Sequence, residues 1–76
     1  MTDTSSERAN TLGDALPREM TRVRDQVMPA YQAIGPSGAW ALSNMRRDLD
    51  DAQRALAEGD VVAMLRVYES LKGYET

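Results

Sequence analysis

Cysteine and histidine are both absent from this chain of 76 residues, and phenylalanine is absent as well. Without cysteine no disulfide can form, and without either residue the common structural zinc sites are excluded. The same absence removes the side chains that most often act as nucleophile, base or acid, and no serine stands in a motif with an evident base. We therefore expect a protein that is not an enzyme and that holds no metal or cofactor.

The chain also has little material for a core. A domain of this length buries only about 60% of the surface that its unfolded chain exposes, so its stability is marginal. Small domains offset this with disulfides, metals or a partner chain, and only the last is open to a chain without cysteine and histidine. We therefore expect a homodimer in which two copies pack face to face or intertwine.

A net positive charge and long apolar runs are missing too. The net charge of −3 argues against general binding to nucleic-acid backbones, which depends on lysine and arginine. No apolar run approaches the ~20 residues that span a bilayer, and the polar N-terminus has neither the basic nor the apolar part of a secretory signal. We expect a cytoplasmic protein that binds neither nucleic acid nor a membrane directly.

What the sequence does contain is helical periodicity. Residues 1–14 are polar and predict a disordered tail. Downstream, apolar residues recur at every third or fourth position, which predicts a helix over 16–34 with Pro17 at its first position. Pro29 lies inside this pattern, and its ring crowds the carbonyl of Asp25, so a bend is predicted between these two residues.

Two more helices are predicted, over 37–58 and 61–72. Gly59 can adopt the left-handed conformation that ends a helix, and Asp60 can accept the first free amide hydrogens of the next one. Such a short link predicts an antiparallel helical hairpin. The predicted fold is therefore all-α, with a bent N-terminal helix and a hairpin in one domain over 15–76.

The apolar faces of these helices predict the core or the dimer interface. Its members are Met20, Val23, Val27, Tyr31, Met45, Leu49, Leu56, Leu65 and Tyr68. In the last helix the buried face is expected to include Val61 as well as Leu65.

Residues beside turns or on polar helix faces are the candidates for binding a partner protein. They are Trp40, Tyr74, Asp48, Asp50, Asp51, Arg46 and Arg47. Aromatic residues and arginine carry much of the binding energy in protein interfaces. For Trp40 the alternative is that it closes the end of the small core.

The charged residues of the middle helix suggest ordinary surface pairs. Arg47 and Asp51 are four residues apart, as are Asp50 and Arg54, so each pair can interact weakly along the helix. The acidic run from Asp48 does not fit a calcium loop, because glutamine and glycine stand where such a loop needs glycine and glutamate.

Arg18, Arg22 and Arg24 gather near the start of the first helix. Two interpretations stay open: they pair with acidic neighbours such as Glu19 and Asp25, or they contact an acidic partner or a phosphate.

The link between the last two helices resembles the turn of tetratricopeptide-type repeats through Ala52, Ala55, Leu56, Gly59 and Asp60, followed by Tyr68. Only one unit is present, whereas a solenoid needs several repeats to bury a continuous core. The likeness therefore concerns the helical turn and not a repeat array.

A second resemblance covers residues 16 to about 73. The segment 16–24, followed by Met28, Pro29 and Tyr31 and then by 34–36, resembles small early proteins of transposable Pseudomonas-type phages, a group that includes an anti-quorum-sensing anti-activator. The resemblance implies a helical homodimer that keeps a host LuxR-type transcriptional regulator from DNA, with a pilus-assembly ATPase as another host target. The alternatives are a scaffold dimer without inhibitory role and nucleic-acid binding through the arginines.

Overall fold

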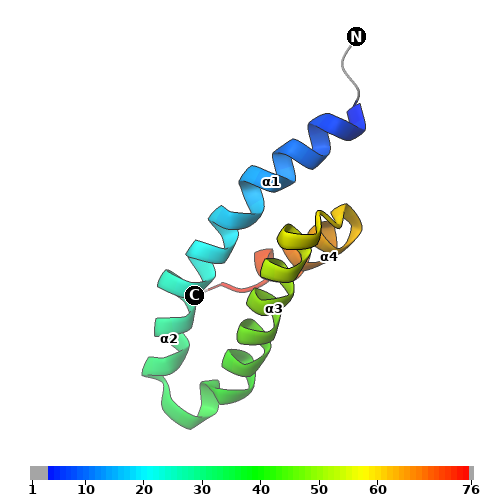
Figure 1. Cartoon of the computed structure of the whole chain (residues 1–76). Coiled ribbons are helices and arrows are strands. Elements are labelled where there is room, and N and C mark those ends of the chain that lie inside the picture. The colour runs from blue at the N-terminus through cyan, green and yellow to red at the C-terminus, as the bar shows by residue number, and fades with distance from the viewer. Residues whose placement is uncertain (1–3, 76) are drawn as a thin grey trace.

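The computed structural model of the chain describes residues 4–75, with side chains from Thr11 onward. The described chain is helical almost throughout and contains no strand (Figure 1). Its elements are α1 (Thr4–Arg22), a π-helical stretch η1 (Val23–Val27), α2 (Met28–Ala33), a 3₁₀ turn η2 (Gly35–Gly38), α3 (Ala39–Glu58) and α4 (Val61–Lys72). The sequence therefore predicted the all-α class correctly.

The first helix begins at Thr4, so the prediction of a disordered tail is wrong for residues 4–14. Leu12 stands four residues before Leu16 and packs against the core, which carries the apolar face one turn further back than the sequence suggested. N-terminal to Leu12, α1 extends past the other helices (Figure 1). No other helix packs against this part, so it needs no apolar face. The predicted tail at residues 1–3 lies outside the described residues.

Pro17 and Pro29, the prolines of α1 and α2, both lie within helical backbone. Pro17 is inside α1 and not at its first position, which corrects the prediction. Pro29 lies in the first turn of α2, directly after η1. Because Pro29 cannot donate a hydrogen bond to the carbonyl of Asp25, the helix loses its regular pattern there, and the structure has a π-helical stretch where the sequence predicted a bend.

The link between α3 and α4 consists of Gly59 and Asp60. Gly59 has a φ of 67°, in the left-handed region, and the N–H of Asp60 reaches back to the carbonyl of Ala55 at 3.0 Å. The Asp60 carboxylate then accepts a 3.1 Å hydrogen bond from the N–H of Ala63 in the first turn of α4. α4 occupies the predicted range of 61–72 and packs against both α3 and α1.

The core lies where α1, η1 and α2 meet α3 and α4. Its buried residues are Leu16, Val23, Val27, Met28, Leu42, Met45, Ala52, Ala55, Met64, Val67 and Leu71. Of the other predicted core residues, Met20, Tyr31, Leu49, Leu56 and Tyr68 are half-buried and pack against this cluster.

The predicted buried face of α4 is partly wrong. Leu65 is 49% exposed and Val61 is 41% exposed, whereas Val67, which was not predicted, is buried. Apolar residues occur on every side of this helix, so periodicity alone cannot choose the face that turns inward. Contacts with α1 and α3 decide it, and they leave aliphatic side chains of α4 in solvent.

Candidate interaction surfaces

The first candidate surface is the outer face of α4, which we define as Val61, Val62 and Leu65. Val62 is 65% exposed and lies beside the two half-exposed residues described above. Leu65 follows Val61 by four residues and Val62 by three, so it neighbours both on the helix surface and joins the three aliphatic side chains into one patch. A contiguous apolar patch on a small protein typically marks a contact with another molecule.

Arg66, four residues after Val62, contributes to the lining of an open groove between α3 and α4 with a volume of about 310 Å³. Small apolar side chains, among them Ala55 and Ala63, form part of its lining. The charged side chains that line it are Asp48, Asp51, Glu58, Asp60, Arg54 and Arg66, so acidic groups outnumber basic ones. The outer face of α4 thus meets this predominantly acidic groove where Val62 neighbours Arg66, whereas Val61 and Leu65 lie further round the helix.

Tyr74 and Asp48, both expected to bind a partner, bind each other. The Tyr74 hydroxyl donates a 2.7 Å hydrogen bond to Oδ2 of Asp48, and the ring packs against the core. Burial, and then the hydrogen bond and the negative charge of Asp48, raise the pKa of Tyr74 to about 12, against a smaller opposing effect of Arg47. The Tyr31 hydroxyl donates to the carbonyl of Glu75 at 3.3 Å. Two tyrosines thus hold the C-terminal segment against α2 and α3.

The remaining charged candidates of α3 are exposed: Arg46, Arg47, Asp50 and Asp51. The predicted four-residue pairs are not the ones that form. Arg54 lies 3.8 Å from Asp51, three residues earlier, and Nη2 of Arg47 donates to Oδ1 of Asn44 at 2.8 Å. In both cases the arginine contacts the residue three positions earlier, which is as close on a helix surface as a residue four positions away. Among the side chains described, from Thr11 to Glu75, no group of three acidic residues is arranged to hold a metal ion.

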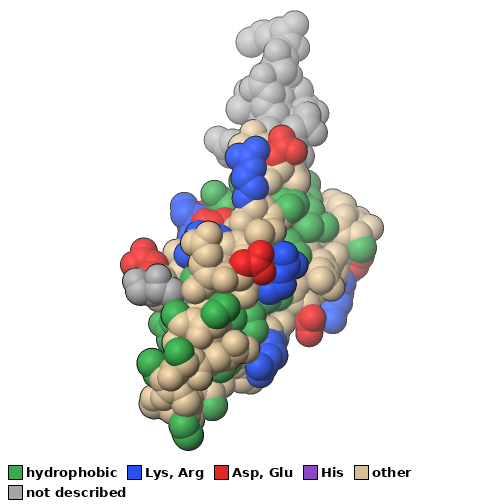
Figure 2. All heavy atoms as spheres, turned by 90° about the vertical axis from the view of Figure 1, so that its left-hand side faces the viewer, with side chains coloured by type: hydrophobic (Ala, Val, Ile, Leu, Met, Phe, Trp, Pro, Cys, Tyr) green, Lys and Arg blue, Asp and Glu red, His purple; other side chains and the backbone are tan. Residues whose placement is uncertain are grey.

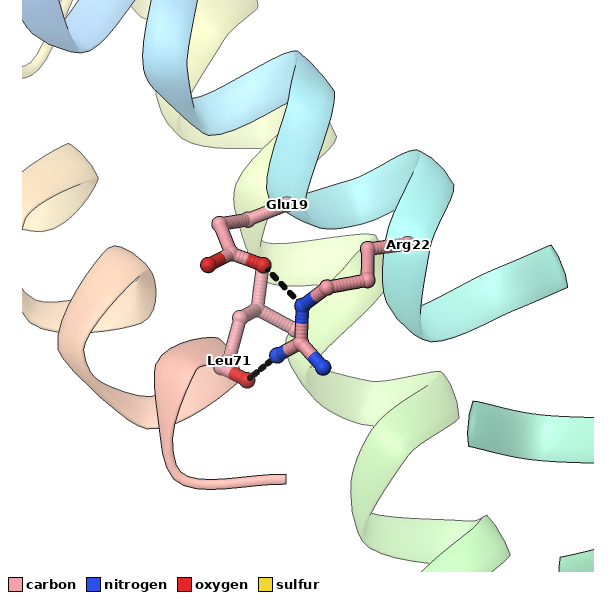
Figure 3. A network of polar contacts seen from close by, with 3 residues as sticks. All are labelled: Glu19, Arg22 and Leu71. Carbon is pink, nitrogen blue, oxygen red and sulfur yellow. Dashed lines mark hydrogen bonds and ion pairs between the residues drawn. The ribbon is translucent and has the colours of Figure 1, made fainter. Parts of the chain in front are cut away.

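Arg22 has a structural role. Its Nη2 donates a 3.0 Å hydrogen bond to the carbonyl of Leu71 while its Nε pairs with Glu19, as Figure 3 shows. The carbonyl belongs to the last turn of α4 and also accepts a 3.1 Å hydrogen bond from the backbone N–H of Tyr74, so Arg22 adds a second donor at this helix end. Arg24 pairs with Asp25 at 3.0 Å, and this contact raises the pKa of Arg24. For these two arginines the interpretation as acidic pairs is confirmed.

The second candidate surface, which we call the uncharged end, comprises the exposed residues of the stretch 26–45, around the turn between α2 and α3. No charged residue occurs in this stretch, although 28% of the chain is charged. Trp40 is 79% exposed and Ile34 is 57% exposed, so Trp40 does not close the core and that alternative is wrong. On the face shown in Figure 2, the lower end of the molecule accordingly lacks blue and red side chains.

The turn that carries these two residues is tightly packed. Gly38 is buried, and a Cβ at this position would collide with the backbone carbonyl oxygen of Tyr31. Glycine therefore lets α2 and the start of α3 approach closely. The exposed side chains of Ile34 and Trp40 are presented by a compact turn and not by a long loop.

The candidate residues do not form one site. Trp40 stands in the first turn of α3 and Asp60 comes two residues after its last residue, so they are separated by the length of a helix of about 30 Å. The sequence grouped Trp40 with Tyr74 and Asp48, but the structure brings together only the last two. The sequence analysis did not predict Val62 as a surface residue. The dipeptide Val61-Val62 could have indicated it, because adjacent residues of a helix point in different directions and cannot both face the core fully.

Comparison with known proteins supplies no relative for this chain. No protein family, curated protein or solved structure matches it. Within residues 4–75 no helix combines the length and apolar character that crossing a membrane requires.

Proposed function

We propose that this protein is a small non-catalytic protein-binding module that inhibits a host protein. The observation that carries the proposal is the exposure of Val61, Val62 and Leu65 on one side of α4. An apolar centre beside a charged groove has the composition of a protein interface, in which apolar contacts supply affinity and charged groups supply specificity.

The acidic border of the groove favours a basic partner surface. Proteins that bind DNA do so through lysine and arginine, and a protein that covers these residues blocks access to DNA. A LuxR-type transcriptional regulator, the host target implied by the resemblance to phage early proteins, offers such a surface. The pilus-assembly ATPase is the second host target that the same resemblance suggests.

The active form that we propose is a homodimer. The support is the size of the chain together with its lack of cysteine, because a core this small has no covalent reinforcement. A second copy would also cover apolar surface that a single chain leaves in water.

A displacement assay tests the inhibitory function. Labelled operator DNA is bound to a purified LuxR-type regulator, and this protein is added while fluorescence anisotropy reports the fraction of bound DNA. We expect release of the DNA, and we expect Leu65→Asp to abolish release because it places a charge in the apolar centre. Ile34→Asp is the matched control, since it also replaces an exposed aliphatic residue with aspartate. Ile34 is 57% exposed and lies just before η2, near the opposite end of α3.

Two results would contradict the proposal. If the DNA stays bound at saturating protein, the regulator is not the target. If Ile34→Asp abolishes release and Leu65→Asp does not, the partner binds at the uncharged end. Light scattering on the same samples gives the mass, and a dimer that leaves both the regulator and the ATPase unaffected would favour the scaffold alternative.

A further inference from the structure

The π-helical stretch η1 inserts one extra residue between α1 and α2, which follow each other as one continuous helical stretch (Figure 1). The N–H of Met28 reaches back five residues to the carbonyl of Val23, whereas a regular α-helix pairs residues four apart. Each residue after η1 therefore has the orientation that the residue before it would have in an unbroken α-helix.

This extra residue decides which apolar side chain after η1 faces the core. In an unbroken α-helix, Ile34 would follow the buried Leu16 by five full turns and lie on the same side. Met28 would point about 120° away from Leu16. The structure has the reverse arrangement, because Met28 is 9% exposed and Ile34 is 57% exposed.

The sequence provides an apolar face for both orientations. In an unbroken α-helix, Val27 and Ile34 lie close to two full turns apart and share the side of Leu16. With η1 in place, Met28 takes the inward position that Ile34 loses, while Val27 stays buried. One large apolar side chain is buried in either case, so the hydrophobic effect alone does not strongly favour one orientation.

We propose that η1 is a conformational switch between two helical registers. The π register is the one described, with Met28 inward and Ile34 in solvent. In the α register the extra residue is absorbed, α2 turns by about 100°, and the two side chains exchange places. Pro29 favours the π register, because in an α-helix its ring would crowd the carbonyl of Asp25.

The proline shifts the balance between the registers without forbidding the α register. Pro17 lies inside α1, so this chain accommodates a proline within α-helical backbone. Two contacts of Tyr31 also belong to the π register. Its hydroxyl donates to the carbonyl of Glu75, and its own carbonyl lies where a side chain on Gly38 would collide. Turning α2 would break the first contact and change the second, which couples the register to both neighbouring segments.

The two registers present different surfaces while the main core is kept. Leu16 and Val23 do not follow the extra residue, so their inward orientation is the same in both registers. Ile34 is offered to solvent in the π register and Met28 in the α register. Any ligand that distinguishes these surfaces shifts the balance between them. The switch is independent of the proposed host contact on α4.

Single cysteines test the switch, because the native chain has none. Ile34→Cys and Met28→Cys are made separately, each with Pro29 and with Pro29→Ala, and the rate of thiol reaction with an aromatic disulfide reagent is measured. With Pro29 present, Ile34→Cys should react fast and Met28→Cys slowly. Removing the proline should shift the balance toward the α register by about 100-fold, so the order of the two rates should reverse.

Pro17→Ala is the matched control, since it removes a proline from a helix without a π-helical stretch and should leave both rates unchanged. Removal of Gln26 gives a second test. Because it takes out the extra residue of η1, the residues after it should keep their described orientation in a regular α-helix. Combined with Pro29→Ala, this removal should restore the fast reaction of Ile34→Cys. Circular dichroism verifies that each variant is folded.

Unchanged rates in a folded Pro29→Ala chain would overturn the proposal. Equal effects of Pro17→Ala and Pro29→Ala would overturn it too, because they would show a general loosening of the helix. If Pro29→Ala does not fold, relaxation-dispersion NMR of the native chain takes its place. Exchange shared by the amides of residues 24–34 would support the switch, and its absence would refute it.

Discussion

The phenol of Tyr74 donates a 2.7 Å hydrogen bond to the carboxylate of Asp48, which lies 26 positions earlier in the chain. Tyr74 follows α4 and Asp48 lies in the middle of α3, so the bond ties the end of the chain to the centre of the fold. Tyr31 adds a second attachment through the carbonyl of Glu75. Two residues that the sequence assigned to a partner interface therefore close the structure of the chain itself.

Tyr74→Phe keeps the ring and removes this hydrogen bond. We expect the free energy of unfolding to fall by about 1 kcal/mol, because the hydroxyl is lost and the partly buried Asp48 oxygen loses its donor. Urea denaturation followed by circular dichroism measures the change. Tyr74→Ala should cost more since it also removes ring packing, and equal stability of the native chain and Tyr74→Phe would show that the bond contributes nothing.

The same contact predicts a loss of stability at alkaline pH. The pKa of Tyr74 is raised from 10.0 in the unfolded chain to about 12 in the folded one, so between these values the folded state holds a proton that the unfolded state has released. The stabilisation is complete below pH 10.0 and is lost as the pH rises toward about 12. Ultraviolet absorbance should show one tyrosine ionising last. The pH dependence of urea denaturation should flatten in Tyr74→Phe, and an unchanged dependence would assign it to other groups.

Arg22→Met tests the contact between the end of α1 and the last turn of α4. The variant keeps much of the aliphatic chain but removes the side-chain donor of the Leu71 carbonyl and the partner of Glu19, so we expect a loss of about 1 kcal/mol in the free energy of unfolding. Arg24→Met is the control. Its exposed pair with Asp25 is screened by solvent, so its thermal midpoint should match that of the native chain. Equal losses in both variants would point to a general effect of removing charge.

Two valines of α4 test which side of that helix is buried. Val67→Ala should lower the free energy of unfolding by about 2 kcal/mol, because two buried methyl groups are lost and a cavity remains. Val62→Ala makes the same chemical change at an exposed position and should stay within about 0.5 kcal/mol of the native chain. Thermal denaturation of the two variants gives the comparison. The reverse order would place Val62 in the core and Val67 in solvent.

Alanine substitutions at two glycines distinguish the effect of a steric clash from the effect of helix propensity. Gly38→Ala should destabilise the chain by at least about 2 kcal/mol, because the added Cβ collides with the backbone of Tyr31 and the turn must open. Gly13→Ala, in α1 with nothing close to the new Cβ, should stabilise the helix by up to about 1 kcal/mol. Differential scanning calorimetry measures both. A tolerated Gly38→Ala would mean that α2 and α3 can separate at little cost.

The sequence was informative wherever a single residue type controls the local backbone. Gly59 and Asp60 could be assigned to the end of one helix and the start of the next because few residues other than glycine tolerate a positive φ and because aspartate caps a helix. Pro29 marked the irregular stretch for the same reason, since it has no N–H to donate. The polar start of α1 was missed because a helix that projects into solvent shows no apolar period.

By itself the sequence determined the all-helical class, the bounds of α4, the link before it and the lack of residues for disulfide, zinc or histidine chemistry. These follow from local backbone preferences and from composition, which need no knowledge of distant contacts. Only the tertiary structure decided that Val67 faces inward while Val62 and Leu65 face outward, that Tyr74 binds Asp48 and that Trp40 stands in solvent. Each of these depends on which helix faces which, and an apolar residue carries the same local signal whether a neighbouring helix covers it or not.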